Sequence, residues 1–210
     1  MKKIGYFGLL WLFLFGSVLG FVIEGLWSWY RFGAWMNHSA TVWGPLCIIY
    51  GLGLVVLFLL SRCFGRLNFV LRFVLFALSG AVLELVSGLA QNLVFGSRSW
   101  DYGGAFWGFI NLEMTMFWGI LGMLFYYLLY PLLARVLGRL EGRLWRVLGI
   151  IATVWLVMNF TMTSLAVWRW GARLAEQPAR NGVDSYLDTH YGDDRMRSIF
   201  PNMEFRKFGD

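Results

Sequence analysis

Long apolar stretches separated by short polar ones dominate this chain. A transmembrane helix needs roughly 20 mostly apolar residues to cross the hydrocarbon core of a bilayer. The pattern predicts five such helices, over residues 4–30, 45–61, 69–95, 110–134 and 147–169. Residues 1–170 are therefore expected to form a five-span transmembrane domain, and residues 171–210 a short tail.

The composition agrees with this pattern. Hydrophobic residues make up 59% of the chain and charged residues 14%, whereas a typical soluble domain is about 25% charged. A cleaved signal peptide is the competing interpretation of the first helix. It is disfavoured because the apolar stretch continues to Leu26 and ends in Trp27, Trp29 and Tyr30, the aromatic belt of a retained helix. The chain is predicted to be an all-α membrane protein with a bundle of five transmembrane helices.

The basic residues predict the orientation of this bundle. They gather before the first helix and in two loops, at Lys2, Lys3, Arg62, Arg66, Arg72, Arg135, Arg139, Arg143 and Arg146. By the positive-inside rule these regions are cytoplasmic, so loops 31–44 and 96–109 lie outside. The N-terminus is then cytoplasmic and the tail, with six basic and seven acidic residues, extracytoplasmic. The net charge of +6 is explained by topology and does not indicate nucleic-acid binding.

Polar groups that bear on function are few. The sequence contains no nucleotide-binding glycine loop followed by lysine. Cys47 and Cys63 would lie at opposite membrane faces, so no disulfide between them is expected. Both outer loops are rich in tryptophan and glycine, and two placements are open: in the membrane interface or folded back into the protein.

Two glutamates fall inside predicted helices. Residues on the stripe of Glu24 are small or polar, namely Gly16, Ser17, Gly20, Ser28 and Arg31. The stripe of Glu84 is similar, with Ala77, Gly80, Ala81, Ser87, Gly88 and Gln91. Small residues let neighbouring helices approach closely, so both glutamates are predicted to face the bundle interior. Asn159, in the fifth helix, is expected to make interhelical hydrogen bonds.

The candidate site residues all lie between the midplane and the outer edge of the membrane. They are Glu24, Glu84, Glu113, Asp101, Asn37, His38, Arg98, Tyr102 and Asn111. A charge at the bilayer centre costs at least about 2.5–3.5 kcal/mol, so these carboxylates need partners or water. One hypothesis is that Glu24 and Glu84 are protonated, or paired with Arg31 or Arg98, and only hold helices together. The other is an outward-opening polar cavity for a cation, a proton or an amine.

Other chemistry has weaker support in the sequence. No Glu-x-x-His pair is present to build a di-iron type site, so no metal and no cofactor are predicted. No nucleophile with an adjacent histidine base can be assembled, which makes an enzyme the less favoured class.

Several separated motifs resemble one family. They are GSVLGFVIEGLW at 16–27, WGPLCIIYGLG at 43–53, LELVSG at 83–88, SWDYG at 99–103, FINLEMTMFWGILG at 109–122 and YLDTHYGDDRMRSIFPNMEF at 186–205. In these motifs the chain resembles the putative ABC-transporter permease family, type IV, also called CmpB-like bacterial membrane proteins. It departs from the family pattern at His38, Ile48, Gln91 and Ser99.

The resemblance implies a permease or a transport-associated subunit of the bacterial cytoplasmic membrane. It also implies an ATPase on another chain, docked on cytoplasmic loops 62–72 and 135–146, and a further partner that is either a second copy or another membrane chain. Anchoring of the 135–146 arginines to anionic lipid is the simpler interpretation of that loop. Two alternatives remain: an enzyme acting on a lipid or cell-envelope precursor with Glu24 or Asp101 as general base, and a scaffold whose tail binds a partner.

Overall fold

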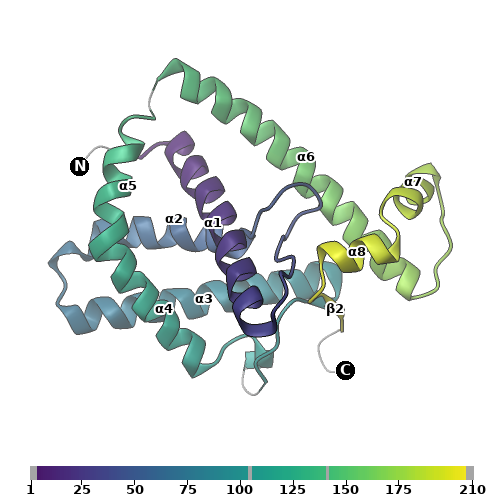
Figure 1. Ribbon diagram of the computed structural model, residues 1–210, viewed down its shortest axis with the longest axis horizontal. Coiled ribbons are helices and arrows are strands. Elements are labelled where there is room, and N and C mark those ends of the chain that lie inside the picture. Colours follow the sequence, from purple (N-terminus) through teal and green to yellow (C-terminus); the bar gives the residue numbers. More distant parts are fainter. Residues whose placement is uncertain (1–3, 104–105, 141, 207–210) are drawn as a thin grey trace.

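The chain folds into helices joined by short connections (Figure 1). The computed structural model describes residues 4–103, 106–140 and 142–206, so the predicted signal at Lys2 and Lys3 lies outside the described residues. The helices are α1 (Tyr6–Phe32), α2 (Ile48–Cys63), α3 (Phe69–Phe95), α4 (Leu112–Leu124), α5 (Tyr130–Leu137), α6 (Arg143–Leu174), α7 (Gly182–His190) and α8 (Asp193–Ile199). Two short strands, β1 (Ser97–Arg98) and β2 (Glu204–Phe205), pair antiparallel. A single turn of 3-10 helix lies at Phe64–Arg66. Phe106–Gly108 form a turn in which all three residues have positive φ.

Four helical segments are long and apolar enough to cross a membrane. They are α1, α3, the continuous segment Leu112–Leu137 and α6. They coincide with four of the five predicted spans. The fifth, predicted at 45–61, corresponds to α2, which has only 16 residues and a length of about 24 Å at 1.5 Å per residue. By length and composition the structure therefore has four long candidate spans and one shorter apolar helix.

Helix α2 is short because the chain enters the protein before the helix begins. The Cys47 N–H, at the start of α2, donates to the Ser17 carbonyl in the middle of α1 at 3.0 Å. Residues 33–47, which we name the first loop, therefore run back beside the C-terminal half of α1. Ser39, Thr41 and Leu46 of this loop are buried. Of the two placements left open by the sequence, the structure has the loop folded back into the protein.

The helices pack in antiparallel pairs through the small residues that the sequence singled out. A Cβ atom built on Gly16 would lie 3.1 Å from the Cα of Gly51, so α1 and α2 nearly touch backbone to backbone. A Cβ atom on Gly80 would overlap the Trp118 side chain, which joins α3 to α4. The predicted small-residue seams of the first and third helices are thus confirmed as packing faces.

The predicted fourth loop, 135–146, is shorter than expected. Helix α5 continues to Leu137 and α6 begins at Arg143, so only residues 138–142 connect them. Between α4 and α5 the helix widens into a π-helical turn, Phe125–Leu129. Pro131 follows directly and has no N–H to donate to the preceding turn, which is a common cause of such a distortion.

Helix α6 extends beyond its predicted span, 147–169, to Leu174. Figure 1 shows α7 and α8, in yellow, folded against its C-terminal end. We call this the tail end of the bundle, and the opposite end, where α5 meets α6, the basic end. A buried apolar cluster joins the tail to the first loop and α6; its residues are Val42, Ala166, Val167, Trp170, Leu187, Tyr191, Met196 and Phe200.

We predict that Gly20→Leu destabilises the protein. A Cβ atom at Gly20 would lie 2.2 Å from that of Tyr50, so the larger side chain must push α2 away from α1. Overpacking of this kind costs about 1–3 kcal/mol, measurable as a lower unfolding midpoint in detergent. Gly182→Ala is the control, because no atom lies within 4 Å of its added Cβ. Equal midpoints for the two variants would contradict the close approach of α1 and α2.

Candidate functional site

Glu24 lies in α1 and meets side chains from two other elements. The Tyr50 hydroxyl, from the first turn of α2, donates to Glu24 Oε1 at 2.5 Å. On the other side, His38 Nδ1 of the first loop lies 3.9 Å from Glu24 Oε2. Tyr50 reaches this carboxylate by passing over Gly20, where a larger residue would block it. The small-residue seam of α1 therefore positions the tyrosine as well as the helix.

Glu84 lies in α3 and is almost completely buried, with 5% of its surface exposed. The Tyr102 hydroxyl donates to Glu84 Oε1 at 3.3 Å. Its other oxygen, Oε2, is buried and has no hydrogen-bond partner among the described residues. A buried carboxylate oxygen in this situation is costly, so a missing partner is expected there.

The two carboxylates belong to one region of the bundle. Tyr102 lies within electrostatic range of both Glu84 and Glu24, and Tyr50 lies within range of Tyr102. Two further buried polar atoms without a described partner, Ser17 Oγ and His38 Nε2, belong to elements that line Glu24 and Tyr50. We name Glu24, Tyr50, Tyr102 and Glu84 the carboxylate–tyrosine cluster.

The predicted pairing of these glutamates with arginines was wrong. Arg98 forms an ion pair with Asp101 at 2.5 Å instead, and Arg31 lies exposed in the last turn of α1. The partners of Glu24 and Glu84 are hydroxyl and ring groups, which compensate a buried negative charge less well than a guanidinium does.

Asp101, Arg98 and Tyr102 belong to residues 96–111, which we name the second loop. The Gly103 N–H donates to Asp101 Oδ1 at 2.8 Å, and this bond, followed by the Arg98 guanidinium, lowers the pKa of the Asp101 carboxyl. Burial raises the pKa of the Tyr102 hydroxyl, and the neighbouring Glu84 adds to this shift. Tyr102 is therefore a hydrogen-bond donor over the physiological pH range.

The other predicted site residues lie elsewhere and have local structural contacts. Asn111 caps α4 by accepting a hydrogen bond from the Met114 N–H at 2.7 Å. Glu113 is exposed in the first turn of α4, where a negative charge favours the helix dipole. Asn37 accepts from the Ser39 N–H at 2.9 Å and stabilises the first loop.

The first loop is held inside the protein by polar groups of α6. Asn159 is fully buried; its Oδ1 accepts from the Trp43 N–H at 3.2 Å and its Nδ2 donates to the Trp43 carbonyl at 2.7 Å. Thr163, one turn further along α6, accepts from the Val42 N–H at 3.0 Å. The predicted role of Asn159 as an interhelical partner was thus wrong: it binds loop backbone.

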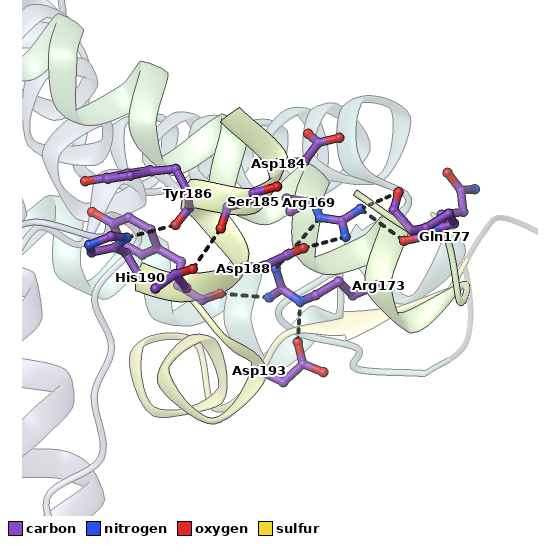
Figure 2. Close-up of polar contacts among 12 residues, drawn as sticks. Arg169, Arg173, Gln177, Asp184, Ser185, Tyr186, Asp188, His190 and Asp193 are labelled. Carbon is purple, nitrogen blue, oxygen red and sulfur yellow. Dashed lines mark hydrogen bonds and ion pairs between the residues drawn. The ribbon is translucent and has the colours of Figure 1, made fainter. Parts of the chain in front are cut away.

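The tail carries a set of ion pairs that sequence analysis missed. Figure 2 shows Arg169 and Arg173, from the end of α6, both directed at Asp188 of α7. Arg169 donates twice to Asp188, at 2.7 Å each, and Arg173 bonds Asp188 at 2.8 Å and Asp193 at 2.7 Å. We name these four residues the tail clamp. The sequence analysis had used the tail charges only as topology signals.

The clamp is electrostatically strong. The hydrogen bonds from Arg169, and then those from Arg173, lower the pKa of Asp188 from 3.8 to about 2. A carboxyl whose pKa is lowered by folding stabilises the fold above its ordinary pKa and loses that contribution as the pH falls toward the lowered value. The clamp is therefore fully charged at neutral pH and weakens only below about pH 4.

Metal coordination has no support in the described part of the chain. No three His, Cys, Asp or Glu side chains of the described residues come together. Glu24 and Glu84 are each hydrogen-bonded to a tyrosine instead. The groups of the cluster that could bind a ligand are therefore carboxylate and hydroxyl oxygens.

The fold and the cluster define a class, a multi-pass helical membrane protein with intramembrane carboxylates. Comparison with known families is more specific. Residues 11–164 match the family described as Putative ABC-transporter type IV (ABC_trans_CmpB). The chain belongs to this family. No curated protein and no solved structure matches the chain.

The match covers the carboxylate–tyrosine cluster but not the tail clamp. Glu24, Tyr50, Glu84 and Tyr102 lie within residues 11–164. The tail motif at 186–205, which sequence analysis also ascribed to the family, lies outside the matched residues.

We predict that Asn159→Leu destabilises the protein by about 1–3 kcal/mol, since it leaves the buried Trp43 N–H without an acceptor. Equilibrium unfolding in detergent measures this. Thr161→Val is the matched control, because Thr161 is exposed two residues away and bonds only the Val157 carbonyl of its own helix. If the two variants unfold alike, Asn159 does not anchor the first loop.

Proposed function

We propose that this protein is a transport-associated membrane subunit whose carboxylate–tyrosine cluster receives a positively charged cargo. The observation that carries the proposal is Glu84 Oε2, a buried carboxylate oxygen without a described partner. An ionisable residue inside a membrane segment most often marks a path for an ion or a substrate. Membership of the transporter family makes that use the most economical one here.

The charge balance around the cluster favours a cation. No ion pair among the described residues involves Glu84, and the ring of His38 is the basic group that comes within 4 Å of Glu24. Two carboxylates from different helix pairs therefore face a region with little positive charge. A cation that enters it is stabilised by both, because electrostatic interactions are strong where water is excluded.

The proposed site contains fewer of the nine candidate residues than the sequence analysis suggested. Asp101 is already neutralised by Arg98, and Glu113 is exposed on α4. Asn37 and Asn111 bond backbone groups. In the proposed site Glu24 and Glu84 bind the cargo, and Tyr50 and Tyr102 hold the two carboxylates in place. His38 lies beside Glu24.

The alternatives have less support from the geometry. Asp101 is a poor general base, because Arg98 and the Gly103 N–H both stabilise its charged form. A scaffold that recruits partners through its tail is less favoured because the clamp carboxylates are already bound to α6.

We further propose that the basic end faces the cytoplasm of a bacterial cell and the tail end the outside. An ATPase subunit would then dock near residues 62–72 and 135–146. Cys63 is exposed at the basic end and provides a probe. A membrane-impermeant maleimide should leave Cys63 unlabelled in intact cells and label it after permeabilisation. Labelling in intact cells would overturn both the orientation and the docking surface.

We predict that a monovalent cation stabilises the purified protein against unfolding. At a concentration 100 times the dissociation constant, a ligand specific for the native state adds about 2.7 kcal/mol. The unfolding midpoint should rise with methylammonium, sodium or potassium chloride when choline chloride keeps the ionic strength constant. Glu24→Gln and Glu84→Gln should each abolish the rise.

Glu113→Gln is the matched control, since it removes an exposed carboxylate outside the cluster and should keep the rise. Failure of all three cations to stabilise the wild-type protein would overturn the proposal. An equal loss in Glu113→Gln would show that the effect comes from overall charge.

A further inference from the structure

The tail contacts both loops that bring side chains to the carboxylates. The first loop carries His38, which lies beside Glu24. The second loop carries Tyr102, which bonds Glu84. Both loops are far from the tail in the sequence, so these contacts arise from the tertiary fold.

Two hydrogen bonds join the tail to the first loop. Trp43 Nε1 donates to the Tyr191 hydroxyl at 3.0 Å, and Asn37 Nδ2 donates to the Ser198 carbonyl of α8 at 3.3 Å. Val42 also packs into the apolar cluster that buries Tyr191. The loop is thus pressed between α6 and the tail.

A strand pair joins the tail to the second loop. In it, β2 pairs with β1, with Ser97 opposite Phe205 and Arg98 opposite Glu204. Asn92, at the end of α3, donates to the Arg206 carbonyl at 2.8 Å and fixes the strand further. Tyr102 follows β1 by only four residues, so the position of β2 constrains how the tyrosine meets Glu84.

The tail clamp fastens these elements to α6. Besides its ion pairs, Arg173 donates to the Tyr191 carbonyl at 2.8 Å, and Arg169 to the Gln177 carbonyl at 3.1 Å. The clamp therefore fixes the C-terminal end of α7 and the start of α8 to α6 (Figure 2). Charge-assisted bonds of this kind are about twice as strong as neutral ones.

We propose that the tail is a cover held closed by the clamp, and that a ligand approaching Glu84 from the tail end enters only when the clamp opens. The structure is the closed state: Glu84 is 5% exposed and bonded to Tyr102, and the loop that carries Tyr102 is joined to the tail through β1 and β2. The identity of the ligand rests on the proposed function, whereas the closure does not.

Carboxyl footprinting on the full-length protein in nanodiscs tests the closure. The probe is a water-soluble carbodiimide with glycine ethyl ester, and mass spectrometry reads the labelling of each carboxylate. In the wild-type protein Glu84 should be protected and Glu113, which is exposed, should be labelled. With Asp188→Asn the labelling of Glu84 relative to Glu113 should rise about tenfold or more, as expected when charge-assisted bonds that oppose a local opening are lost.

Asp184→Asn is the matched control. Asp184 lies on the same helix but bonds the Arg180 N–H and not the clamp arginines, so Glu84 should stay protected. Hydrogen exchange separates opening from misfolding: in Asp188→Asn only residues 182–206 and the two loops should lose protection, while α1, α3 and α4 keep it.

Unchanged protection of Glu84, together with faster exchange in residues 182–206, would show that the tail is released without exposing the site and would overturn the proposal. Faster exchange throughout α1, α3 and α4 would equally overturn it, since the clamp would then stabilise the whole fold. If Asp188→Asn increases the labelling of Glu84 but the protein binds no cation, the closure by the tail is supported and only the proposed function is overturned.

Discussion

The backbone of the first loop sets the arrangement of the bundle, because polar backbone groups inside a membrane protein must find partners within the protein. Asn159 and Thr163 satisfy the N–H groups of Val42 and Trp43. With these bonds in place the loop occupies space between α6 and the C-terminal half of α1, and α2 begins only at Ile48. That start places Tyr50 on the first turn of α2, within reach of Glu24.

Much of the helical fold follows from local sequence properties. Hydropathy predicted the four long helices, since each is an uninterrupted apolar run whose backbone bonds are made within the segment. The seam around Glu24 was predictable for a related reason: helical periodicity alone puts Gly16 and Gly20 on its face. The length of α2 is close to that of the predicted segment, 45–61. Counting apolar residues did not reveal that the preceding loop folds back between α6 and α1.

The sequence predicted the packing faces that carry Glu24 and Glu84 but not the side chains that surround these glutamates. Helical register carries no information about which side chains from other elements complete the surroundings. Tyr50 and Tyr102 became partners through packing over Gly20 and through the second loop. Asp101 and Glu113 were also candidates, but a local arginine neutralises the first, and the second faces outward from α4.

The ion pairs of the tail could not be predicted from its charge composition. Its charges cancel in sum, but the clamp depends on pairing across the 15 to 20 positions that separate Arg169 and Arg173 from Asp188 and Asp193. Partly exposed ion pairs add little stability one by one. A network in which one carboxylate binds two guanidiniums is more specific, since a shift of α7 breaks several bonds together. Such a network suits a segment that is either docked or released, because its bonds form and break together. The apolar packing of α1 against α2 through Gly16 and Gly51, in contrast, would resist movement of one helix along the other.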